Sequence, residues 1–523
     1  MKKKRILSVL IALTLSIVVF AGCGSRVDRN VVPTSGQAEP AQPAGVVPTQ
    51  VSPVSAPVET ETGIPRYIFL FIGDGMGYAQ IQMASFYLGA LRSNGGVDSV
   101  RLSFMDFPAK GSTETWDLTS FAPDSASAAT SIASGIKTWS GTINYDSSLT
   151  VQQETIAEKL KAQLGYRVGI VTTVNLCHAT PAAFYAKVPS RSDVYGIGQQ
   201  LVASGFDYFA GGDFARPTGP NRDQPHLHDL ARAAGYKVVT TYEDTAQLTP
   251  ADGKAIVIAE RLDRARAMKY ALDKAPGEWT LADYTAQAIE MLYNDTGFFV
   301  MIESGKVDWA GHANDAAATL YDILAFDEAV KVALDFYAKY PDDTLIIVTG
   351  DHETGGLTIG FAGTNFDTFL TNISAQKVTH EVFGSRNSQA YRRSGTSFEE
   401  VLVDIHELFG LTTEENAAAA VHESLVLTEW ELGLLRQAYD RTMAGERAQA
   451  ENQAEYLSWG SHDPLTVTIT SLVNNKSGIG WTSWSHTGAP VPVFALGVGA
   501  DKFTGFYDNT DIFFKLVALT DAR

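Results

Sequence analysis

Short runs of apolar residues alternate along this chain with longer segments in which apolar residues recur every three or four positions. The short runs have the length of single buried strands, and the longer segments have the period of an α-helix. We predict strands over 67–72, 167–173, 237–241, 255–259, 298–302, 344–349 and 491–496. We predict helices between them, among others over 151–163, 281–293 and 316–340.

Continuous apolar strands that alternate with amphipathic helices indicate an α/β fold, with a mostly parallel central sheet flanked by helices on both faces. Residues 362–480 break this alternation and contain two helical patterns, 397–409 and 428–444. We therefore expect a partly helical insertion before the last strand, 491–496. This insertion could be a lid, a subdomain or an oligomer contact, and the hydrophobic pattern is compatible with all three.

The first 23 residues have the pattern of a targeting signal. Four basic residues at 2–5 precede seventeen uncharged residues, 6–22. The run ends Phe20-Ala-Gly-Cys23, which resembles the bacterial lipobox, where a signal peptidase cuts before a lipidated cysteine. This predicts an exported lipoprotein, anchored through Cys23 and facing the periplasm or the cell exterior. The alternative is an uncleaved membrane anchor, because seventeen residues reach the lower limit for a span.

Residues 24–63 differ in composition from the rest of the chain. They contain six prolines and no aromatic residue. Such a segment buries too little apolar surface to offset the entropy of ordering it. We predict a disordered, proline-rich tether over 24–63 and a folded body over 64–523, starting near Ile64.

Charge and cysteine content narrow the classes of partner. The 523 residues carry a formal net charge of −19, which argues against a nucleic-acid-binding surface. A phosphate substrate would need local positive charge at its site, and bound metal ions supply it. If Cys23 is processed, Cys177 has no partner for a disulfide, and we predict it to be a buried thiol.

Carboxylates follow or end three of the predicted strands. Glu303 comes directly after 298–302, whereas one glycine separates 67–72 from Asp74 and another separates 344–349 from Asp351 and His352. In open α/β sheets, ligands bind beyond the carboxyl ends of the strands. Asp74 is followed by glycine, so a role in a turn is the alternative for it.

Two further histidines follow the same trend. Asp308 and His312 are four residues apart, so one helical turn would place them on one face. His486 lies in Trp-Ser-His-Thr-Gly, just before 491–496. A lone histidine in a protein is usually not a metal ligand and has its hydrogen bonds satisfied by neighbours. Here, however, several acids all fall at strand ends, which would be a rare coincidence for unrelated core residues, so we interpret the acids and histidines together as candidate metal ligands. Mixed Asp and His ligands suit Zn²⁺, and oxygen ligands alone suit Mg²⁺.

A helix of small side chains is predicted from Ser125 to a closing Gly135. The free N–H groups and partial positive charge of a helix N-terminus attract anions, which makes Ser125 a candidate attacking group. The alternative is that Asp124 or Ser125 only caps the helix. The chain contains no Gly-x-Ser-x-Gly elbow, so an α/β-hydrolase triad is not indicated.

Taken together, these motifs resemble the alkaline phosphatase family. The resemblance runs from about Tyr67 to the C-terminus and is weakest across 362–480. It rests on motifs that occur in the family's order: Asp74-Gly-x-Gly, Asp124-Ser125-Ala, Asp308 to His312, Asp351-His352 and His486-Thr-Gly.

The resemblance implies roles that spacing alone does not. Ser125 matches the nucleophile, and Arg191 matches a guanidinium that grips two phosphate oxygens, a bidentate task for which lysine is unsuited. The implied metal ligands are Asp308, His312 and His486 for a first Zn²⁺, Asp74, Asp351 and His352 for a second Zn²⁺, and Asp74, Thr180 and Glu303 for one Mg²⁺.

Two positions depart from the enterobacterial branch of that family. His178 stands where that branch has an aspartate near the magnesium, and Trp309 where it has a lysine beside the phosphate. The identity of the third metal is therefore open. The activity implied is hydrolysis of phosphate monoesters through a phosphoserine, with release of inorganic phosphate and an alkaline optimum. A homodimer is compatible with the resemblance, since many relatives are dimers.

Two other functions remain as alternatives. One is a phosphodiesterase or sulfatase relative on the same metal scaffold. The Ser125-Ala-Ser-Ala-Ala segment lacks the arginine that accompanies formylglycine in sulfatases, and diesterase relatives commonly use threonine. The other is a non-catalytic lipoprotein that stores zinc or captures phosphate, which would not need Ser125 at a helix start.

Overall fold

The computed structural model describes residues 63–446 and 452–523. The predicted signal, the tether up to Thr62 and the lipidation site Cys23 lie outside these residues, and these assignments stay predictions. Over the described ranges, no helix has the length and apolar character needed to span a bilayer.

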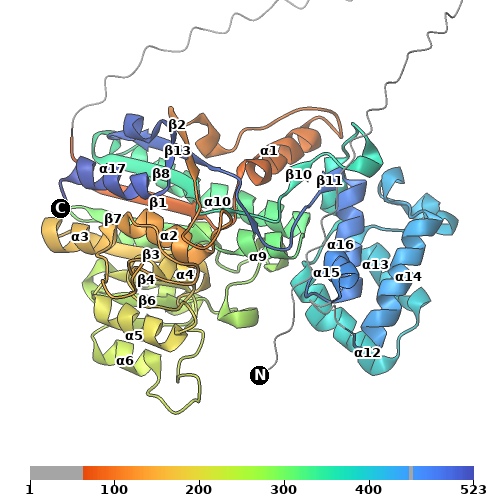
Figure 1. Ribbon diagram of the computed structural model, residues 1–523, viewed down its shortest axis with the longest axis horizontal. Helices are drawn as coiled ribbons and strands as arrows, with labels where there is room; N and C mark the ends of the chain where they lie inside the picture. The colour runs from red at the N-terminus through yellow and green to blue at the C-terminus, as the bar shows by residue number, and fades with distance from the viewer. Residues whose placement is uncertain (1–62, 447–451) are drawn as a thin grey trace, which may run out of the picture. The chain divides into compact units, whose positions relative to one another are not determined.

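A ten-stranded sheet forms the centre of the fold (Figure 1). Its strand order is β14-β2-β13-β8-β1-β7-β3-β4-β6-β5, and its neighbours are parallel except that β13 is antiparallel to both β2 and β8. The strands are β1 Tyr67–Gly73, β2 Ala109–Glu114, β3 Arg167–Asn175, β4 Tyr208–Gly212, β5 Lys237–Val239, β6 Ala255–Ile258, β7 Phe298–Ser304, β8 Thr344–Gly350, β13 Val491–Gly497 and β14 Gly505–Asp508. The predicted mostly parallel α/β fold is confirmed.

The sheet corrects one prediction and adds strands that the pattern did not reveal. The last strand of the chain is β14 rather than the predicted 491–496, which corresponds to β13. β14 pairs with β2 at one edge of the sheet and is partly exposed, so it lacks an apolar run. β2 has the sequence Ala-Lys-Gly-Ser-Thr-Glu and is also partly exposed. β4 is fully buried but short, and it ends in two glycines.

Helices cover both faces of the sheet. Successive residues of β1 alternate between two hydrophobic clusters: Ile68, Leu70 and Ile72 enter one, and Tyr67, Phe69 and Phe71 the other. The first cluster also contains apolar residues of α2 Ser125–Ser134, α3 Ile156–Leu164, α5 Val194–Ser204, α6 Leu227–Ala233 and α17 Thr510–Thr520. The second contains residues of α1 Tyr78–Arg92, α8 Leu281–Leu292 and α10 Ala316–Tyr337.

Two helix boundaries differ from the periodicity. The predicted helix 151–163 begins at Ile156, because Thr155 caps α3 and forms a capping box with Glu158. The predicted helix 316–340 ends at Tyr337. An isolated apolar residue, Val151, precedes the first helix, and Ala338 and Tyr340 follow the second, so the predicted ranges extend too far.

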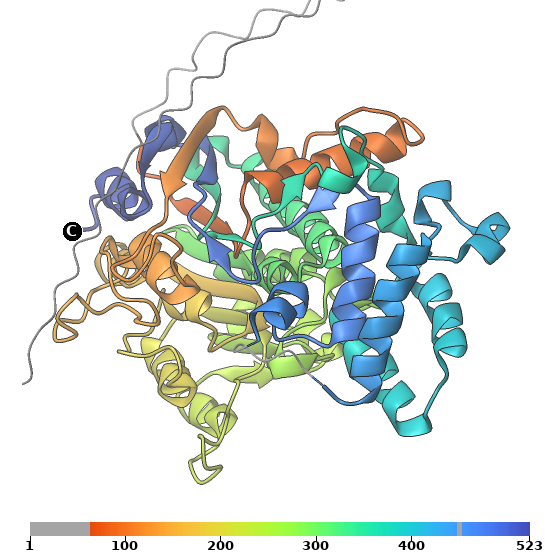
Figure 2. The same cartoon turned by 45° about the vertical axis from the view of Figure 1, so that its right-hand side comes forward.

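Residues 362–480 are largely helical and pack around a third hydrophobic cluster. The segment leaves from β10 Thr358–Ile359 and returns through β11 Ile479–Gly480, and these two strands pair antiparallel. Figures 1 and 2 show its helices gathered to one side of the central sheet. They are α11 His380–Val382, α12 Gln389–Ser394, α13 Phe398–Phe409, α14 Glu429–Met443, α15 Gln453–Trp459 and α16 Pro464–Lys476.

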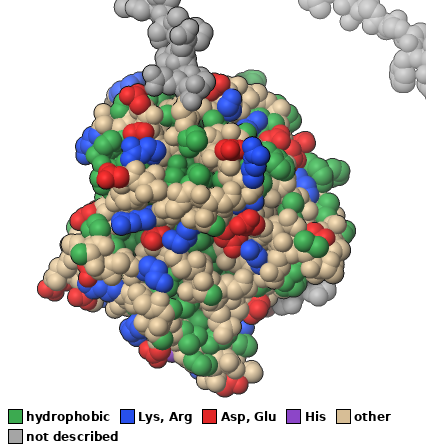
Figure 3. Space-filling view, turned by 90° about the vertical axis from the view of Figure 1, so that its left-hand side faces the viewer, with side chains coloured by type: hydrophobic (Ala, Val, Ile, Leu, Met, Phe, Trp, Pro, Cys, Tyr) green, Lys and Arg blue, Asp and Glu red, His purple; other side chains and the backbone are tan. Residues whose placement is uncertain are grey.

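The face in Figure 3 carries lysine and arginine side chains interspersed with acidic and apolar ones. The expectation that the protein does not bind nucleic acid rests on the net charge of −19 and stays a prediction.

Candidate active site

Three buried carboxylates meet at the carboxyl ends of three neighbouring strands. β1 lies between β7 and β8, and the register pairs Gly73 with Ser304 and with Gly350. Asp74 follows β1, Glu303 is the penultimate residue of β7, and Asp351 follows β8. All three carboxylates are fully buried. Their placement at one edge agrees with the prediction from the strand ends.

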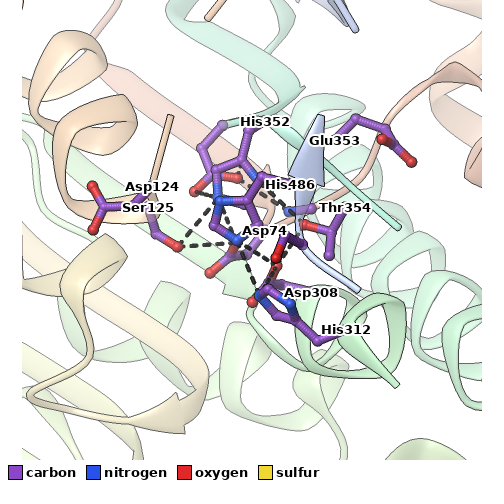
Figure 4. Close-up of polar contacts among 12 residues, drawn as sticks. Asp74, Asp124, Ser125, Asp308, His312, His352, Glu353, Thr354 and His486 are labelled. Atoms are coloured by element: carbon purple, nitrogen blue, oxygen red, sulfur yellow. Dashed lines mark hydrogen bonds and ion pairs between the residues drawn. The ribbon is translucent and has the colours of Figure 1, made fainter. Parts of the chain in front are cut away.

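A short helix brings two further predicted ligands to this edge. Asp308 and His312 lie one turn apart on α9 Lys306–His312, with His312 Nε2 3.5 Å from Asp308 Oδ1. His486, in β12 His486–Thr487, places its Nε2 3.4 Å from the same oxygen and 3.0 Å from His312 Nε2. Figure 4 shows these side chains converging from separate elements.

The backbone fixes the tautomer of both rings. His312 Nδ1 lies 2.7 Å from the carbonyl oxygen of Trp484, and His486 Nδ1 lies 2.6 Å from that of Pro123. A carbonyl oxygen only accepts, so each Nδ1 carries hydrogen and donates it. In the neutral rings, each Nε2 then has a lone pair, and both lone pairs point toward the Asp308 carboxylate. Three acceptors that converge on one point fit a cation.

The same residues perturb one another's ionisation in the absence of a metal. Burial lowers the pKa of His486, but the neighbouring Asp308 carboxylate outweighs this and raises it to about 9. Burial likewise raises the pKa of Asp308, but His312 and His486 hold it well below its ordinary value. In the protein alone, His486 therefore holds a proton beside the ionised Asp308 near neutral pH, and a metal ion would displace that proton.

A second group surrounds the hydroxyl of Ser125. His352 Nε2 lies 3.5 Å from Asp74 Oδ1 and 3.5 Å from Asp351 Oδ2. The Ser125 Oγ is 3.2 Å from His352 Nε2 and 3.5 Å from Asp74 Oδ1. Burial and the nearby carboxylates raise the pKa of Asp74, and burial first of all raises that of Asp351 to about 7. Acids this close and this buried need a compensating cation to be ionised together.

A third group contains Asp74, His178 and Glu303. Glu303 Oε1 and His178 Nδ1 are buried and have no hydrogen-bond partner in the described structure. Burial raises the pKa of Glu303 to about 8 and lowers that of His178 to about 3, so the ring is neutral. The Thr180 hydroxyl donates to Asp74 Oδ2 at 3.2 Å and to Asp351 Oδ2 at 3.5 Å.

The donor atoms within each of these three groups lie within 4.8 Å of one another. Nitrogen and oxygen donors are mixed in the first two groups. In the third group His178 Nε2 accepts from Arg191, so its Nδ1 carries hydrogen, and the orphaned Glu303 oxygen indicates that this set of contacts is incomplete. The residues therefore fit bound divalent metal ions.

At the start of α2, Asp124 caps the helix and Ser125 faces the candidate ligands. Asp124 Oδ1 accepts from the Ser127 amide at 3.0 Å, so Asp124 is the N-cap. The Ser125 hydroxyl is left to face the second group instead. Asp124 Oδ2 also accepts from Arg191 Nη1 at 2.9 Å. Burial raises the pKa of Asp124, but Arg191 and backbone N–H groups outweigh it, so the pKa lies below its ordinary value.

A cavity of about 550 Å³ opens onto these side chains. Arg191 lines it from the loop before α5, and its Nη2 lies 3.1 Å from His178 Nε2. Trp309 lines it from α9, with its ring centroid 5.9 Å from that of His178. Both residues that depart from the enterobacterial pattern, His178 and Trp309, therefore border this cavity.

Sequence reasoning missed Thr354, which connects the two histidine groups. Its hydroxyl donates to Asp308 Oδ1 at 2.6 Å and lies 3.3 Å from His352 Nδ1. It belongs to β9 Glu353–Thr354, which pairs with the strand that holds His486. Its position two residues after His352 was the only signal available. Thr172, whose hydroxyl donates to Glu303, was missed as well.

Cys177 lies beside the site but outside its chemistry. It is a buried, free thiol, as predicted. Burial raises its pKa to about 12, so it is not a reactive thiolate.

Comparison with known proteins agrees with this geometry. The family model for alkaline phosphatase matches residues 65–521. Alkaline phosphatase 4 of Bacillus subtilis is 30% identical over 499 residues, which cover 91% of this chain and 93% of that protein. Alkaline phosphatase 3 of the same organism is 29% identical over 456 residues, covering 86% of this chain and 87% of that protein.

Solved structures share the fold. A cold-active alkaline phosphatase from Shewanella sp. superposes with a TM-score of 0.70 at 25% identity, covering 87% of this chain and 99% of that one. The Thermus thermophilus alkaline phosphatase also gives 0.70, at 24% identity, covering 88% of this chain and 92% of that one. With the family model matched across nearly all of the described residues, this chain belongs to the alkaline phosphatase family.

Proposed function

We propose that this protein hydrolyses phosphate monoesters through a phosphoserine on Ser125 and releases inorganic phosphate. The observation that carries this proposal is the position of the Ser125 hydroxyl. It lies 3.2 Å from His352 Nε2 in the second ligand group, and the residue lines the same cavity as Arg191. A cation store or a phosphate-capture protein would not need a hydroxyl there.

We assign Zn²⁺ to the first and second groups and Mg²⁺ to the third. The ligands would be Asp308, His312 and His486; Asp74, Asp351 and His352; and Asp74, Thr180 and Glu303, with His178 beside the last. When bound, these ions supply Lewis-acid chemistry that lowers the pKa of hydroxyl groups and neutralises charge on the phosphoryl oxygens.

The protein's own groups position and bind the phosphoryl group. The first N–H groups of α2 and its helix dipole favour a dianion in front of Ser125. The Arg191 guanidinium can form two parallel hydrogen bonds to phosphoryl oxygens. Asp124 and His178 hold that guanidinium at 2.9 and 3.1 Å, so its orientation is set before substrate binds.

Two displacements complete the reaction. The Ser125 Oγ forms a bond to phosphorus and loses its proton to solvent, and the bond from phosphorus to the ester oxygen breaks. The departing alcohol takes a proton from solvent. A water oxygen then bonds to phosphorus and loses a proton to solvent, while the bond from phosphorus to Ser125 Oγ breaks and Oγ takes a proton from solvent, which releases phosphate and restores the hydroxyl. Two inversions give net retention at phosphorus. We expect an alkaline optimum, because hydroxyl activation and phosphate release are both favoured there.

The test compares ester classes on the purified, zinc- and magnesium-loaded protein. We expect an aryl phosphate monoester to be hydrolysed with a much higher kcat/KM than the matching diester or sulfate ester. Faster hydrolysis of the diester or the sulfate would contradict the proposal, and a rate maximum well below neutral pH would contradict the expected optimum.

We also propose that the protein is exported and anchored through a lipid on Cys23, from the lipobox-like Phe20–Cys23 segment. Labelling of cells with a radioactive fatty acid should mark the wild-type protein and leave Cys23→Ser unmarked. Label on both forms, or on neither, would contradict the anchor.

A further inference from the structure

A second cavity adjoins the catalytic one and shares a wall with it. It has a volume of about 360 Å³ and is lined by residues from Arg264, α9, α11, α12 and the start of α16. Trp309 lines both cavities, so its indole forms their common boundary. α9 thus carries the proposed metal ligands Asp308 and His312, which line the first cavity, and Trp309, which separates the two cavities.

Two arginines line this second cavity with uncommitted side chains. Among the described residues, neither the Arg264 nor the Arg392 guanidinium has a hydrogen-bond or ion-pair partner. Two free guanidinium groups on one cavity wall are notable in a chain of net charge −19. Guanidinium groups pair most favourably with carboxylate and phosphate oxygens.

The two acidic residues of the cavity wall are already engaged. Glu381 Oε1 accepts from the Arg264 backbone N–H at 3.1 Å, and its Oε2 lies 3.6 Å from Lys306 Nζ. Asp463 accepts hydrogen bonds from Ser388, Thr442 and Thr466. Their oxygens are occupied within the protein, whereas the donors of the two arginines are available.

The shared wall is held from behind by a buried cation. Lys306 is fully buried, and its Nζ has no hydrogen-bond partner in the described structure. It lies 4.8 Å from the Trp309 ring centroid and 3.8 Å from that of Tyr270. Cation–π contact of this kind fixes the indole between the cavities. The charge of Lys306 is itself offset by Glu381 and by Asp263, whose Oδ2 lies 3.8 Å from Nζ, so the cationic character of the second cavity comes from its two arginines.

We propose that the second cavity is a subsite for an anionic group on the leaving alcohol, bound by Arg264 and Arg392. The preferred substrates would be phosphate monoesters whose alcohol carries a second phosphate or a carboxylate. This inference rests on the proposed phosphomonoesterase activity. It makes the two arginines specificity-determining residues that do not take part in the chemical steps.

The test uses α,ω-diol bisphosphates of increasing chain length, each compared with the ω-hydroxyalkyl monophosphate of equal length. We expect wild-type protein to favour the bisphosphate in kcat/KM at one range of lengths. In the Arg264→Gln/Arg392→Gln double variant this preference should fall by at least about tenfold, the size expected for lost charge-assisted hydrogen bonds. Hydrolysis of the hydroxyalkyl esters should not change.

Arg386→Gln is the matched control, because Arg386 is exposed on the adjoining π-helical turn and does not line the cavity. It should keep the wild-type preference. The proposal is overturned if wild type shows no preference at any length, or if the double variant keeps it. A further control adds free sulfate. If sulfate changes the rates for all substrates equally, whatever their chain length, and the double variant loses this effect, then the two arginines form a separate anion site and the proposal is overturned.

Failure of the activity itself would look different. If no ester is hydrolysed, the proposed function is wrong, and the subsite is then tested by equilibrium binding of the same bisphosphates. Their affinity should fall in the double variant and not in Arg386→Gln; equal affinity in all three proteins would overturn the subsite.

Discussion

His312 and His486 face each other through their Nε2 atoms at 3.0 Å, while the Nδ1 of each ring donates to a backbone carbonyl. Two lone pairs at this separation would repel, so the site holds a cation: in the protein alone it is the proton on His486, whose pKa is raised to about 9, and a bound metal ion would take its place. The second-sphere carbonyls thus hold both rings in the orientation and tautomer of metal ligands. Figure 4 shows the same convergence for His352 and Asp74 around Ser125.

Metal removal should destabilise the protein, because buried acids such as Glu303 and Asp351 then lose their counter-charge. We expect a chelator to abolish activity and lower the midpoint of thermal unfolding, and zinc with magnesium to restore both. Free metal at about 1,000 times its Kd contributes on the order of 4 kcal/mol. Scanning calorimetry measures the shift, and an unchanged midpoint in fully metal-free protein would refute this coupling.

His312→Ala should remove one zinc equivalent and leave the second group intact. Metal analysis after dialysis would show the difference. Retention of the full wild-type zinc content would mean that His312 is not a ligand.

Thr354→Val should weaken metal binding, because the hydroxyl that donates to Asp308 and orients His352 is lost while the shape is kept. We expect metal affinity to fall by about 10- to 100-fold, as for other second-sphere changes. Thr354→Ser keeps the hydroxyl and should retain most of the affinity. A competition titration with a chromogenic chelator distinguishes them; equal loss in both variants would point to packing instead.

Asp124 combines two roles that substitutions can separate. Asn at this position can still cap α2, so Asp124→Asn should keep thermal stability but loosen Arg191 and raise KM. Asp124→Ala should lose the cap as well, at a cost of about 1 kcal/mol. Kinetics and thermal unfolding on the same preparations test this. A large loss of stability in the Asn variant, or an unchanged KM in both, would be inconsistent with this assignment.

Asp322 is a buried acid outside the three ligand groups, and it gives a pH effect of its own. Burial raises its pKa from 3.8 to about 7. The folded state therefore holds this proton more tightly than the unfolded state, and the stability it contributes below about pH 4 is lost as pH rises through 7. Relative to wild type, Asp322→Asn should therefore become more stable as the pH rises from about 4 to about 7, with little further change above that range.

The unfolding midpoints of both proteins, measured at each pH, test this expectation. Asp335→Asn is the control, because Asp335 is exposed on the same helix, α10. A difference between Asp322→Asn and wild type that does not change with pH would exclude the shifted group.

The positions of Asp74, Glu303 and Asp351 could be predicted from the sequence, because each lies at the end of an apolar run. Parallel pairing of β7, β1 and β8 then brings the ends of these strands to one edge of the sheet. Asp308 and His312 were predictable for the same reason, since helical spacing is local. Thr354 was not, because a hydroxyl that orients two ligands has no distinctive spacing. The sequence around Arg191 is typical of a surface loop, and only the family resemblance identified this residue. Its contacts with Asp124 and His178 depend on tertiary structure and have no local sequence signal.

The same limit applies to the strands. Buried central strands such as β1, β7 and β8 were predicted nearly to the residue, because both of their faces are apolar. Edge strands β2 and β14 take their conformation from pairing rather than from their own composition. The cavity behind Trp309 could not be predicted either, since its wall combines α9 with residues from the 362–480 segment.

The central claim is that the hydroxyl of Ser125 attacks phosphorus. Metal-loaded protein should be mixed with a ³²P-labelled aryl monoester, quenched in acid and mapped by peptide mass spectrometry. We expect label on Ser125 in wild type and no label in Ser125→Ala that still binds its metals. Label on another residue, or rapid turnover by Ser125→Ala, would contradict the account.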